Sequence, residues 1–170
     1  MEAQRLQLEK RIDDAFADVT QPKLPNLFAC PMHGPSRKCE ECSELREFFG
    51  KKVREILMQS EAQKCLYYVS SLALFTPEGF QYFLPLYLKL SLLSQENASR
   101  INLVFHFQRP PNTASQMNYS IERIRPLKRV QKEVVRDTLY FLRDNYGILE
   151  EDIEDAIGFL FDPLNSISCT

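Results

Sequence analysis

Four residues in the first third of the chain have the types and the spacing of zinc ligands: Cys30, His33, Cys39 and Cys42. They follow the pattern C-x2-H-x5-C-x2-C, and a gap of two residues lets both side chains of a pair turn onto one ion. Zinc prefers four sulfur and nitrogen ligands in a tetrahedron, and four protein ligands leave no position for water. The pattern therefore predicts one zinc ion per chain, in a structural and not a catalytic site.

The same four residues allow two other interpretations. Reduced thiols can occur at these spacings by chance, without any metal. A C-x2-C pair at the start of a helix also resembles a redox dithiol motif, although the βαβ pattern that accompanies such motifs is absent from this sequence. Five cysteines, an odd number, in a chain whose first residues are too charged for an export signal favour a reducing compartment. We therefore expect a cytoplasmic protein.

The predicted metal site falls in a proline-rich segment. Residues 19–42 contain four prolines, and proline fixes φ and lacks an N–H group, so we expect an irregular loop there. A loop of this length in a compact domain is usually functional, mobile or held by something specific. Bound zinc would hold this loop in place.

Outside the loop, the sequence predicts one mainly α-helical domain over residues 1–170. A chain of 170 residues that is 44% hydrophobic and 26% charged fits a single globular core. Apolar residues recur at helical spacing, and Cys65 lies on one such apolar face. We expect about six helices, with a further helical turn at 53–58, over residues 1–18, 40–49, 60–73, 76–94, 127–143 and 149–161.

Three segments give more specific expectations. Thr76, Pro77 and Glu78 form a helix start, and the helix that follows is apolar around most of its circumference, so we place it in the centre of the core. Residues 100–108 alternate like a strand, although a single strand makes no sheet and the run could also be helical or an extended connector. Residues 109–118 are expected to be a loop.

Basic residues gather just before the acidic C-terminal helix. Between Glu122 and Arg136 the chain has six basic and two acidic residues, and positions 128, 132 and 136 share one helix face. This stripe could bind an acidic partner protein or nucleic acid, or it could be a solvated face that pairs with the acidic residues 150–155. The chain has no tryptophan and no aromatic residues within the stripe, which disfavours nucleic acid. The candidate partner-binding residues are Arg123, Arg125, Lys128, Arg129, Lys132 and Arg136.

The sequence offers little support for catalysis or for a membrane. It contains no G-x-S-x-G, Walker, G-x-G-x-x-G or H-E-x-x-H motif. Its longest apolar stretch, 79–93, is interrupted by Gln81, Pro85 and Lys89, so we expect no membrane span. We therefore expect a non-enzymatic module that binds another protein, for example as an immunity or antitoxin-like protein. The alternatives are a nucleic-acid-binding regulator that uses the stripe and an enzyme built on carboxylates. The sequence does not set the oligomeric state.

Two segments resemble a known family. Residues 39–50 read CEECSELREFFG and residues 74–85 read LFTPEGFQYFLP. They resemble a family of small uncharacterised bacterial proteins with a C-x-x-C-x-E-L segment followed by an L-T-P-E-A-F-x-Y-Y-L-P segment. This chain departs from that pattern with Phe75 inserted before Thr76, with Gly79 for alanine and with Phe83 for tyrosine. The resemblance spans about residues 39–143, where it implies a helical bacterial protein, and it implies no particular activity.

Elemental analysis of protein purified without a histidine tag should find about one zinc ion per chain. Cys39→Ser should lose that ion and lower the melting temperature, because metal binding at such a site contributes directly to folding. A metal-free protein, or an unchanged melting temperature in Cys39→Ser, would contradict the zinc interpretation.

Overall fold

The computed structural model describes residues 1–23, 40–49, 53–67, 69–110 and 114–163. Over these residues the chain forms nine α-helices, one 3-10 helix and no strand, so the prediction of a mainly helical protein is confirmed. None of the helices in these ranges combines the length and the apolar character needed to cross a bilayer. The elements are α1 (Glu2–Ala15), α2 (Glu40–Phe49), α3 (Arg54–Ser60), α4 (Ala62–Tyr67), the 3-10 helix η1 (Val69–Leu74), α5 (Pro77–Leu93), α6 (Asn97–Phe105), α7 (Ala114–Ile124), α8 (Arg129–Tyr146) and α9 (Glu150–Phe161).

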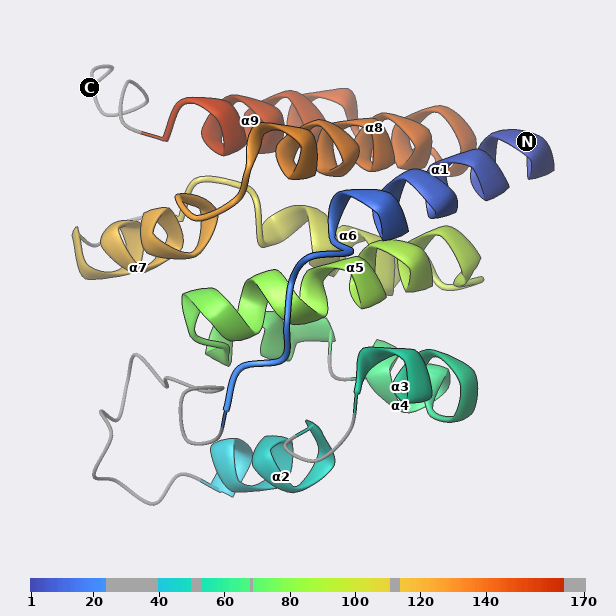
Figure 1. Ribbon diagram of the computed structural model, residues 1–170. Coiled ribbons are helices and arrows are strands. Elements are labelled where there is room, and N and C mark those ends of the chain that lie inside the picture. Colours follow the sequence, from blue (N-terminus) through green and yellow to red (C-terminus); the bar gives the residue numbers. More distant parts are fainter. Residues whose placement is uncertain (24–39, 50–52, 68, 111–113, 164–170) are drawn as a thin grey trace.

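Helix α5 occupies the centre of the fold, as its all-round apolar sequence predicts. Twelve of its seventeen residues are buried, and it packs against α1, α3, α4, η1, α6, α7 and α8. In Figure 1, α1, α8 and α9 lie on one side of α5, and α2, α3 and α4 lie on the other. The predicted helix start is also confirmed, because the Thr76 hydroxyl accepts a hydrogen bond of 3.0 Å from the Gly79 N–H and Pro77 takes the first helical position.

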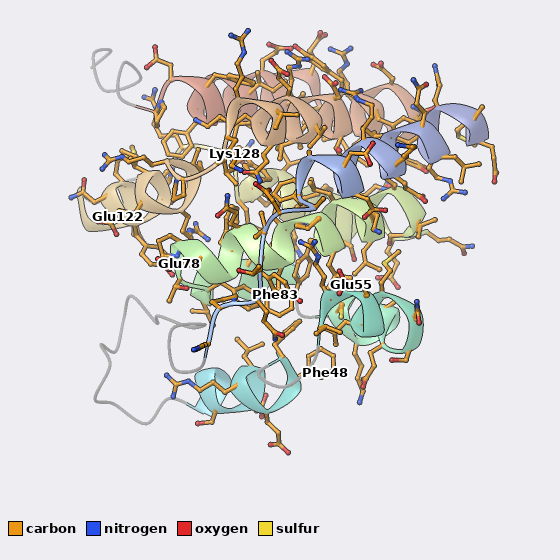
Figure 2. All side chains as sticks on the ribbon, in the orientation of Figure 1. Phe48, Glu55, Glu78, Phe83, Glu122 and Lys128 are labelled. Atoms are coloured by element: carbon orange, nitrogen blue, oxygen red, sulfur yellow. The ribbon has the colours of Figure 1, made fainter. Side chains whose placement is uncertain are left out.

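Aromatic rings join α5 to α2. Phe49 at the end of α2 packs edge-on against Phe83 of α5 and Phe75 before it, with ring centroids 5.1 and 5.4 Å apart. Figure 2 shows Phe83 on the side of α5 that faces α2. All three rings are fully buried, and edge-to-face pairs of this kind contribute beyond the area that they bury. The aromatic residues of segment 74–85, which carries part of the family resemblance, are therefore part of the hydrophobic core.

Helices α8 and α9 form an antiparallel pair. The sequence predicts a turn at residues 144–147, but α8 continues to Tyr146 and Gly147 alone ends it. Gly147 adopts the left-handed conformation with φ 69°, which glycine reaches without steric strain, and its N–H donates to the carbonyl of Arg143. The Lys132 ammonium near the start of α8 donates to the carbonyl of Leu160 near the end of α9 over 2.8 Å, which fixes the antiparallel arrangement.

A buried glutamine joins α1, α5 and α8. The Gln131 side chain is fully buried, and its Nε2 donates to the carbonyl of Ala15 at the end of α1 over 3.1 Å. Its Oε1 accepts from the Gln81 amide of α5 at 2.9 Å and from the Lys128 N–H at 3.0 Å. One side chain thus satisfies a carbonyl at a helix C-terminus and an N–H at a helix N-terminus, groups that a helix leaves without internal partners.

A buried arginine fixes the connection from α5 to α6. The Arg100 guanidinium donates to the carbonyl of Ser91 (3.2 Å), the carbonyl of Ser94 and the side chain of Asn97 (2.7 Å). Its other contact is the ring of Tyr146 in α8, whose centroid lies 3.4 Å from the guanidinium carbon. A positive charge at these carbonyls is favourable because the C-terminal end of a helix carries partial negative charge.

The structure corrects or decides the sequence interpretation of three segments. Within residues 100–108, whose alternation suggests a strand, α6 continues to Phe105 and a turn follows at 106–107. Arg100, Leu103, Val104 and Phe107 are all buried, and their spacing is helical. The loop expected at 109–118 ends sooner, since α7 begins at Ala114 and buries Ile121 and Ile124. The single helix expected at 60–73 divides into α4 and η1, while Cys65 is buried as predicted.

Gln131→Met should lower the free energy of unfolding by about 2–4 kcal/mol, because it removes the hydrogen-bond partner that Gln131 gives to the Ala15 carbonyl and to the Lys128 N–H. Gln81→Met is the matched control, since it leaves the bonds of Gln131 to α1 and Lys128 in place, and it should cost about 1 kcal/mol. Urea unfolding measures both values. Equal losses in the two variants would show that the junction does not depend on Gln131.

Candidate functional site

The predicted zinc ligands fall almost entirely outside the described residues. Cys30, His33 and Cys39 lie in the undescribed range 24–39, and Cys42 lies in α2, of which the backbone but not this side chain is described. Within the described ranges, no three histidine, cysteine, aspartate or glutamate side chains are close enough to bind a metal ion. Helix α2 begins at Glu40, directly after Cys39, as the sequence predicts. The zinc site itself stays a prediction.

Arg123, the first residue of the predicted basic stripe, is not on the surface. Its side chain is buried between the rings of Phe80 and Tyr119, whose centroids lie 5.2 and 4.9 Å from the guanidinium carbon. Its Nη1 donates to the carbonyl of Leu72 over 2.9 Å, and its buried Nε has no hydrogen-bond partner. Burial lowers the pKa of this guanidinium. Arg123 is therefore part of the contact between α7, α5 and η1, and it cannot meet a partner together with the other five basic residues.

Two exposed residues of the stripe already have acidic neighbours. The Lys128 ammonium bonds to the carboxylate of Asp18 after α1, and its hydrogen bond holds the pKa of that carboxyl below the usual value. Arg129 pairs with Glu133 one turn further along α8 at 2.9 Å. Exposed pairs of this kind contribute little stability, but they reduce the positive charge that the stripe presents. Arg125 is exposed in the turn between α7 and α8.

The remaining two residues of the stripe make contacts along α8. Arg136 pairs with Asp137 at 2.7 Å. Lys132 is half-buried, and burial lowers its pKa. Because its ammonium donates to the carbonyl of Leu160, Lys132 neutralises the negative end of α9. Positions 128, 132 and 136 follow the predicted spacing, but Lys128 and Lys132 contact groups beside α1 and in α9, and Arg136 pairs within α8.

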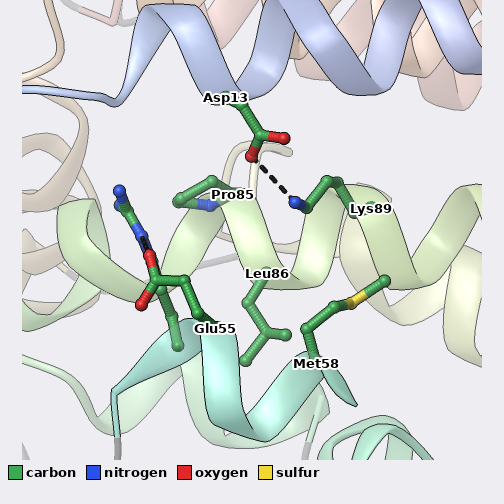
Figure 3. A pocket seen from close by; sticks show the side chains of 7 residues that line it. Asp13, Glu55, Met58, Pro85, Leu86 and Lys89 are labelled. Carbon is green, nitrogen blue, oxygen red and sulfur yellow. Dashed lines mark hydrogen bonds and ion pairs between the residues drawn. The ribbon is translucent and has the colours of Figure 1, made fainter.

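A small cavity lies between α1, α3 and α5 (Figure 3). Its volume is about 40 Å³, which is room for a few water molecules and not for an organic substrate. Asp13 and Lys89 form an ion pair of 2.8 Å across it, and Glu55 pairs with Arg54 at 2.9 Å. The lining residues are Asp13, Arg54, Glu55, Met58, Pro85, Leu86 and Lys89.

The pKa of the Glu55 carboxyl at this cavity lies below its usual value. Burial, the largest single effect, raises the pKa of Glu55, but the hydrogen bond from Arg54, its own backbone and the charges of Arg54 and Lys89 together hold it below the usual value. A general acid near neutral pH needs the opposite shift. Glu55 therefore lacks the raised pKa that a general acid needs.

Arg54 connects α1, α3 and α5, the three helices around the cavity. Its Nη2 donates to the carbonyl of Phe16 over 3.0 Å, and its Nη1 donates to the carbonyl of Tyr82 in α5 over 3.3 Å. The guanidinium carbon also lies 5.1 Å from the centre of the Tyr82 ring. The Arg54 N–H donates to the Tyr82 hydroxyl, and burial raises the pKa of that hydroxyl. The role of this arginine is structural.

A wider groove runs between α1 and α8. Its volume is about 440 Å³, its floor contains Leu8 and Phe141, and an ion pair of 2.5 Å between Arg11 and Asp137 crosses it. Polar side chains form the rest of its lining, namely Gln4, Gln7, Tyr140, Asp144 and Asn145. Both carboxylates of its lining are paired, since Asp144 bonds at 2.8 Å to Arg143, which is not part of the lining.

The outer face of α6 is apolar. Ile101 is 40% exposed and Phe105 is 57% exposed, one helical turn apart, and Ala98 is exposed in the preceding turn. The alternating pattern of 100–108 places Ile101, Leu103 and Phe105 on one side of a strand. In the helix, Leu103 is buried while Ile101 and Phe105 face away from the core. The helical spacing of Ala98, Ile101 and Phe105 could have identified this exposed apolar face from the sequence.

The comparisons with known proteins find a family and nothing more specific. The model of a family described as "Family of unknown function (DUF6714)" matches residues 4–156, which are 153 of the 170 residues. No curated protein and no solved structure matches the chain. The resemblance to an uncharacterised family is thereby confirmed. The match extends from α1 into α9.

Arg54→Lys should lower the free energy of unfolding by about 1–2 kcal/mol, because an ammonium cannot reach the carbonyls of Phe16 and Tyr82 together. Glu55→Gln is the matched control, since it removes only the exposed ion pair and should cost less than about 0.5 kcal/mol. Urea unfolding at neutral pH measures both. A larger effect of Glu55→Gln than of Arg54→Lys would show that the ion pair, and not the carbonyl contacts, stabilises this junction.

Proposed function

The chain belongs to the family of unknown function DUF6714, and we propose that this member is a non-enzymatic module that binds another protein through the outer face of α6. The observation that carries the proposal is the exposure of Ile101 and Phe105 on a helix whose other side is buried. A surface helix normally turns polar residues outward. In α6 two large apolar side chains one turn apart, with Ala98 before them, face outward instead.

The spacing of these residues supports recognition of a helix. Ala98, Ile101 and Phe105 recur at i, i+3 and i+7, which is the spacing by which one helix presents apolar side chains to another. Large exposed aromatic side chains also contribute disproportionately to protein interfaces. Figure 1 places α6 beside α5, with α8 and α9 to one side of it.

The other candidate functions find less support in the described residues. A nucleic-acid-binding regulator would use the basic stripe, but Arg123 is buried and Lys128, Arg129 and Arg136 are paired with carboxylates. A carboxylate-based enzyme would need a cleft with free polar groups, whereas the acids of the small cavity are paired with cations. An immunity or antitoxin-like protein, which neutralises a partner by binding it, is one form of the proposed module.

A structural zinc ion remains a second part of the proposal. Its support is the spacing of Cys30, His33, Cys39 and Cys42 together with the position of α2, which begins at Glu40 between the last two ligands. The positive end of that helix favours thiolates beside it. Thiolate ligands would remain reduced in a cytoplasm, which is the compartment that we propose.

The test is capture from a nuclease-treated lysate of the host, with the tagged full-length chain as bait. We expect a protein in stoichiometric amount, with an affinity that falls about tenfold or more in Phe105→Ser. Leu6→Ser is the matched control, because Leu6 is 52% exposed on α1, away from α6, and this variant should retain the partner.

Two results would contradict the proposal. One is the absence of any stoichiometric protein, and the other is an equal loss in Phe105→Ser and Leu6→Ser. Material that is captured from an untreated lysate but not from the nuclease-treated one, and whose binding depends steeply on salt, would instead favour the nucleic-acid alternative.

A further inference from the structure

Arg123 is a buried cation that no described carboxylate neutralises. Its side chain is only 4% exposed, and none of the described aspartates and glutamates bonds to it or shifts its pKa. Glu78 and Glu122, which Figure 2 shows on α5 and α7, are both exposed and form no ion pair with it. Glu40 and Glu41 are the only carboxylate side chains of the sequence that are not described. A buried charge normally has a partner of opposite sign, so Arg123 is an exception that needs an explanation.

The contacts that Arg123 does make leave much of its charge uncompensated. Its Nη1 donates to the carbonyl of Leu72 over 2.9 Å, and the rings of Phe80 and Tyr119 lie against the guanidinium. A carbonyl and two aromatic faces attract a cation, but none of them carries a net negative charge. These contacts recover only part of the free energy that a charge loses on leaving water. The guanidinium can therefore still attract an anion.

The two nitrogens of Arg123 that lack a partner lie on the same edge of the guanidinium. Nε is the only buried polar side-chain atom of the described residues that has no hydrogen-bond partner. Nη2 donates to none of these residues either, and because Nε alone is both buried and unpartnered, Nη2 reaches solvent. The N–H groups of Nε and Nη2 point the same way in the guanidinium plane. Such a pair of parallel donors matches the two oxygens of a carboxylate.

We propose that Arg123 is a binding site for one carboxylate group, which accepts hydrogen bonds from Nε and Nη2. The proposal does not rest on the outer face of α6. An entering carboxylate meets Nη2 at the surface first, and it reaches Nε as the side chains that cover this atom move apart. The rings of Phe80 and Tyr119 already hold the guanidinium in place, so little side-chain entropy is lost when the ligand binds.

Charge and shape favour a carboxylate over a phosphate group at this position. The contacts of Arg123 within the described residues include no second cation. One carboxylate brings one negative charge, whereas a phosphate monoester brings close to two at neutral pH, and the second charge would have no partner. A carboxylate is also planar, so both of its oxygens can lie in the plane of the guanidinium. A small organic acid and an acidic or C-terminal residue of a bound protein both supply such a group.

The first test follows the Nε–H signal of Arg123 by NMR while propionate is added to the isotope-labelled, full-length chain. The signal is assigned through its contacts with the rings of Phe80 and Tyr119. We expect it to move downfield and to saturate with a Kd of about 1 mM, because Nε–H gains a charge-assisted hydrogen bond that it now lacks. Propionamide, which has the same size and no charge, should bind at least about tenfold more weakly, and inorganic phosphate should also bind more weakly than propionate.

Matched variants test the paired N–H groups. Arg123→Lys keeps the positive charge and removes the parallel donors. Propionate at about ten times its Kd should lower the unfolding equilibrium constant of the wild-type chain about tenfold, and that of Arg123→Lys less than about twofold. Arg125→Lys is the matched control, because Arg125 is exposed in the turn after α7, and this variant should keep the full response. The NMR titration of the wild-type chain needs no variant, so it tests the site even where Arg123→Lys fails to fold.

Capture from a lysate separates the two sources of the carboxylate. A carboxylate of a bound protein predicts that Arg123→Lys loses a protein that the wild-type chain captures. A small organic acid predicts that Arg123→Lys retains any such protein, while native mass spectrometry finds an acid on the purified wild-type chain and none on Arg123→Lys.

Three results would overturn the inference: no movement of the Nε–H signal with propionate, equal binding of propionamide, or an equal response of Arg123→Lys and the wild-type chain. Tighter binding of phosphate than of propionate would also overturn it, because the anion would then not be a carboxylate.

Discussion

The fold depends on the burial of α5. A helix that is apolar around most of its circumference is stable in water only when other elements cover it on every side, and α5 is covered by helices from before and after it in the chain. Its one basic side chain, Lys89, reaches the surface between α1 and α3 and pairs there with Asp13. The arrangement of the remaining helices follows from this requirement, since each buries one face against α5 or against a neighbour that does.

The sequence correctly predicts those features that depend only on residues close together in the chain. The start of α5 at Thr76, the bounds of α2 and the burial of Cys65 all rest on residues within a few positions of one another, and the structure confirms them. The short apolar run of α6 fits both a strand and a helix, and only packing against α5 and α9 decides between them. Gln131 could not be identified as a junction, because its partners lie 50 and 116 positions away.

The same limit applies to the candidate sites. Counting charges between residues 122 and 136 gives a basic stripe, yet burial removes Arg123 from it and carboxylates distant in sequence, such as Asp18, pair with the rest. In the acidic α9, Glu150 and Glu154 lie 3.3 and 4.0 Å from the guanidinium of Arg143 in α8. The predicted zinc ligands depend on spacing alone, and three of the four lie in the range that the structure does not describe. A charge pattern in a sequence thus indicates residues that could bind a partner. The fold determines which of these charges stay exposed and unpaired.

Arg100 gives the outer face of α6 a property that its exposed residues alone do not have. Because its guanidinium holds the end of α5, the start of α6 and the ring of Tyr146 together, α6 cannot turn about its axis without breaking several hydrogen bonds at once. A surface held in this way loses little conformational entropy when it is covered. A complementary ligand would then bind to α6 without a change in the conformation of the helix. Different ligands would differ in affinity mainly through the dissociation rates of their complexes.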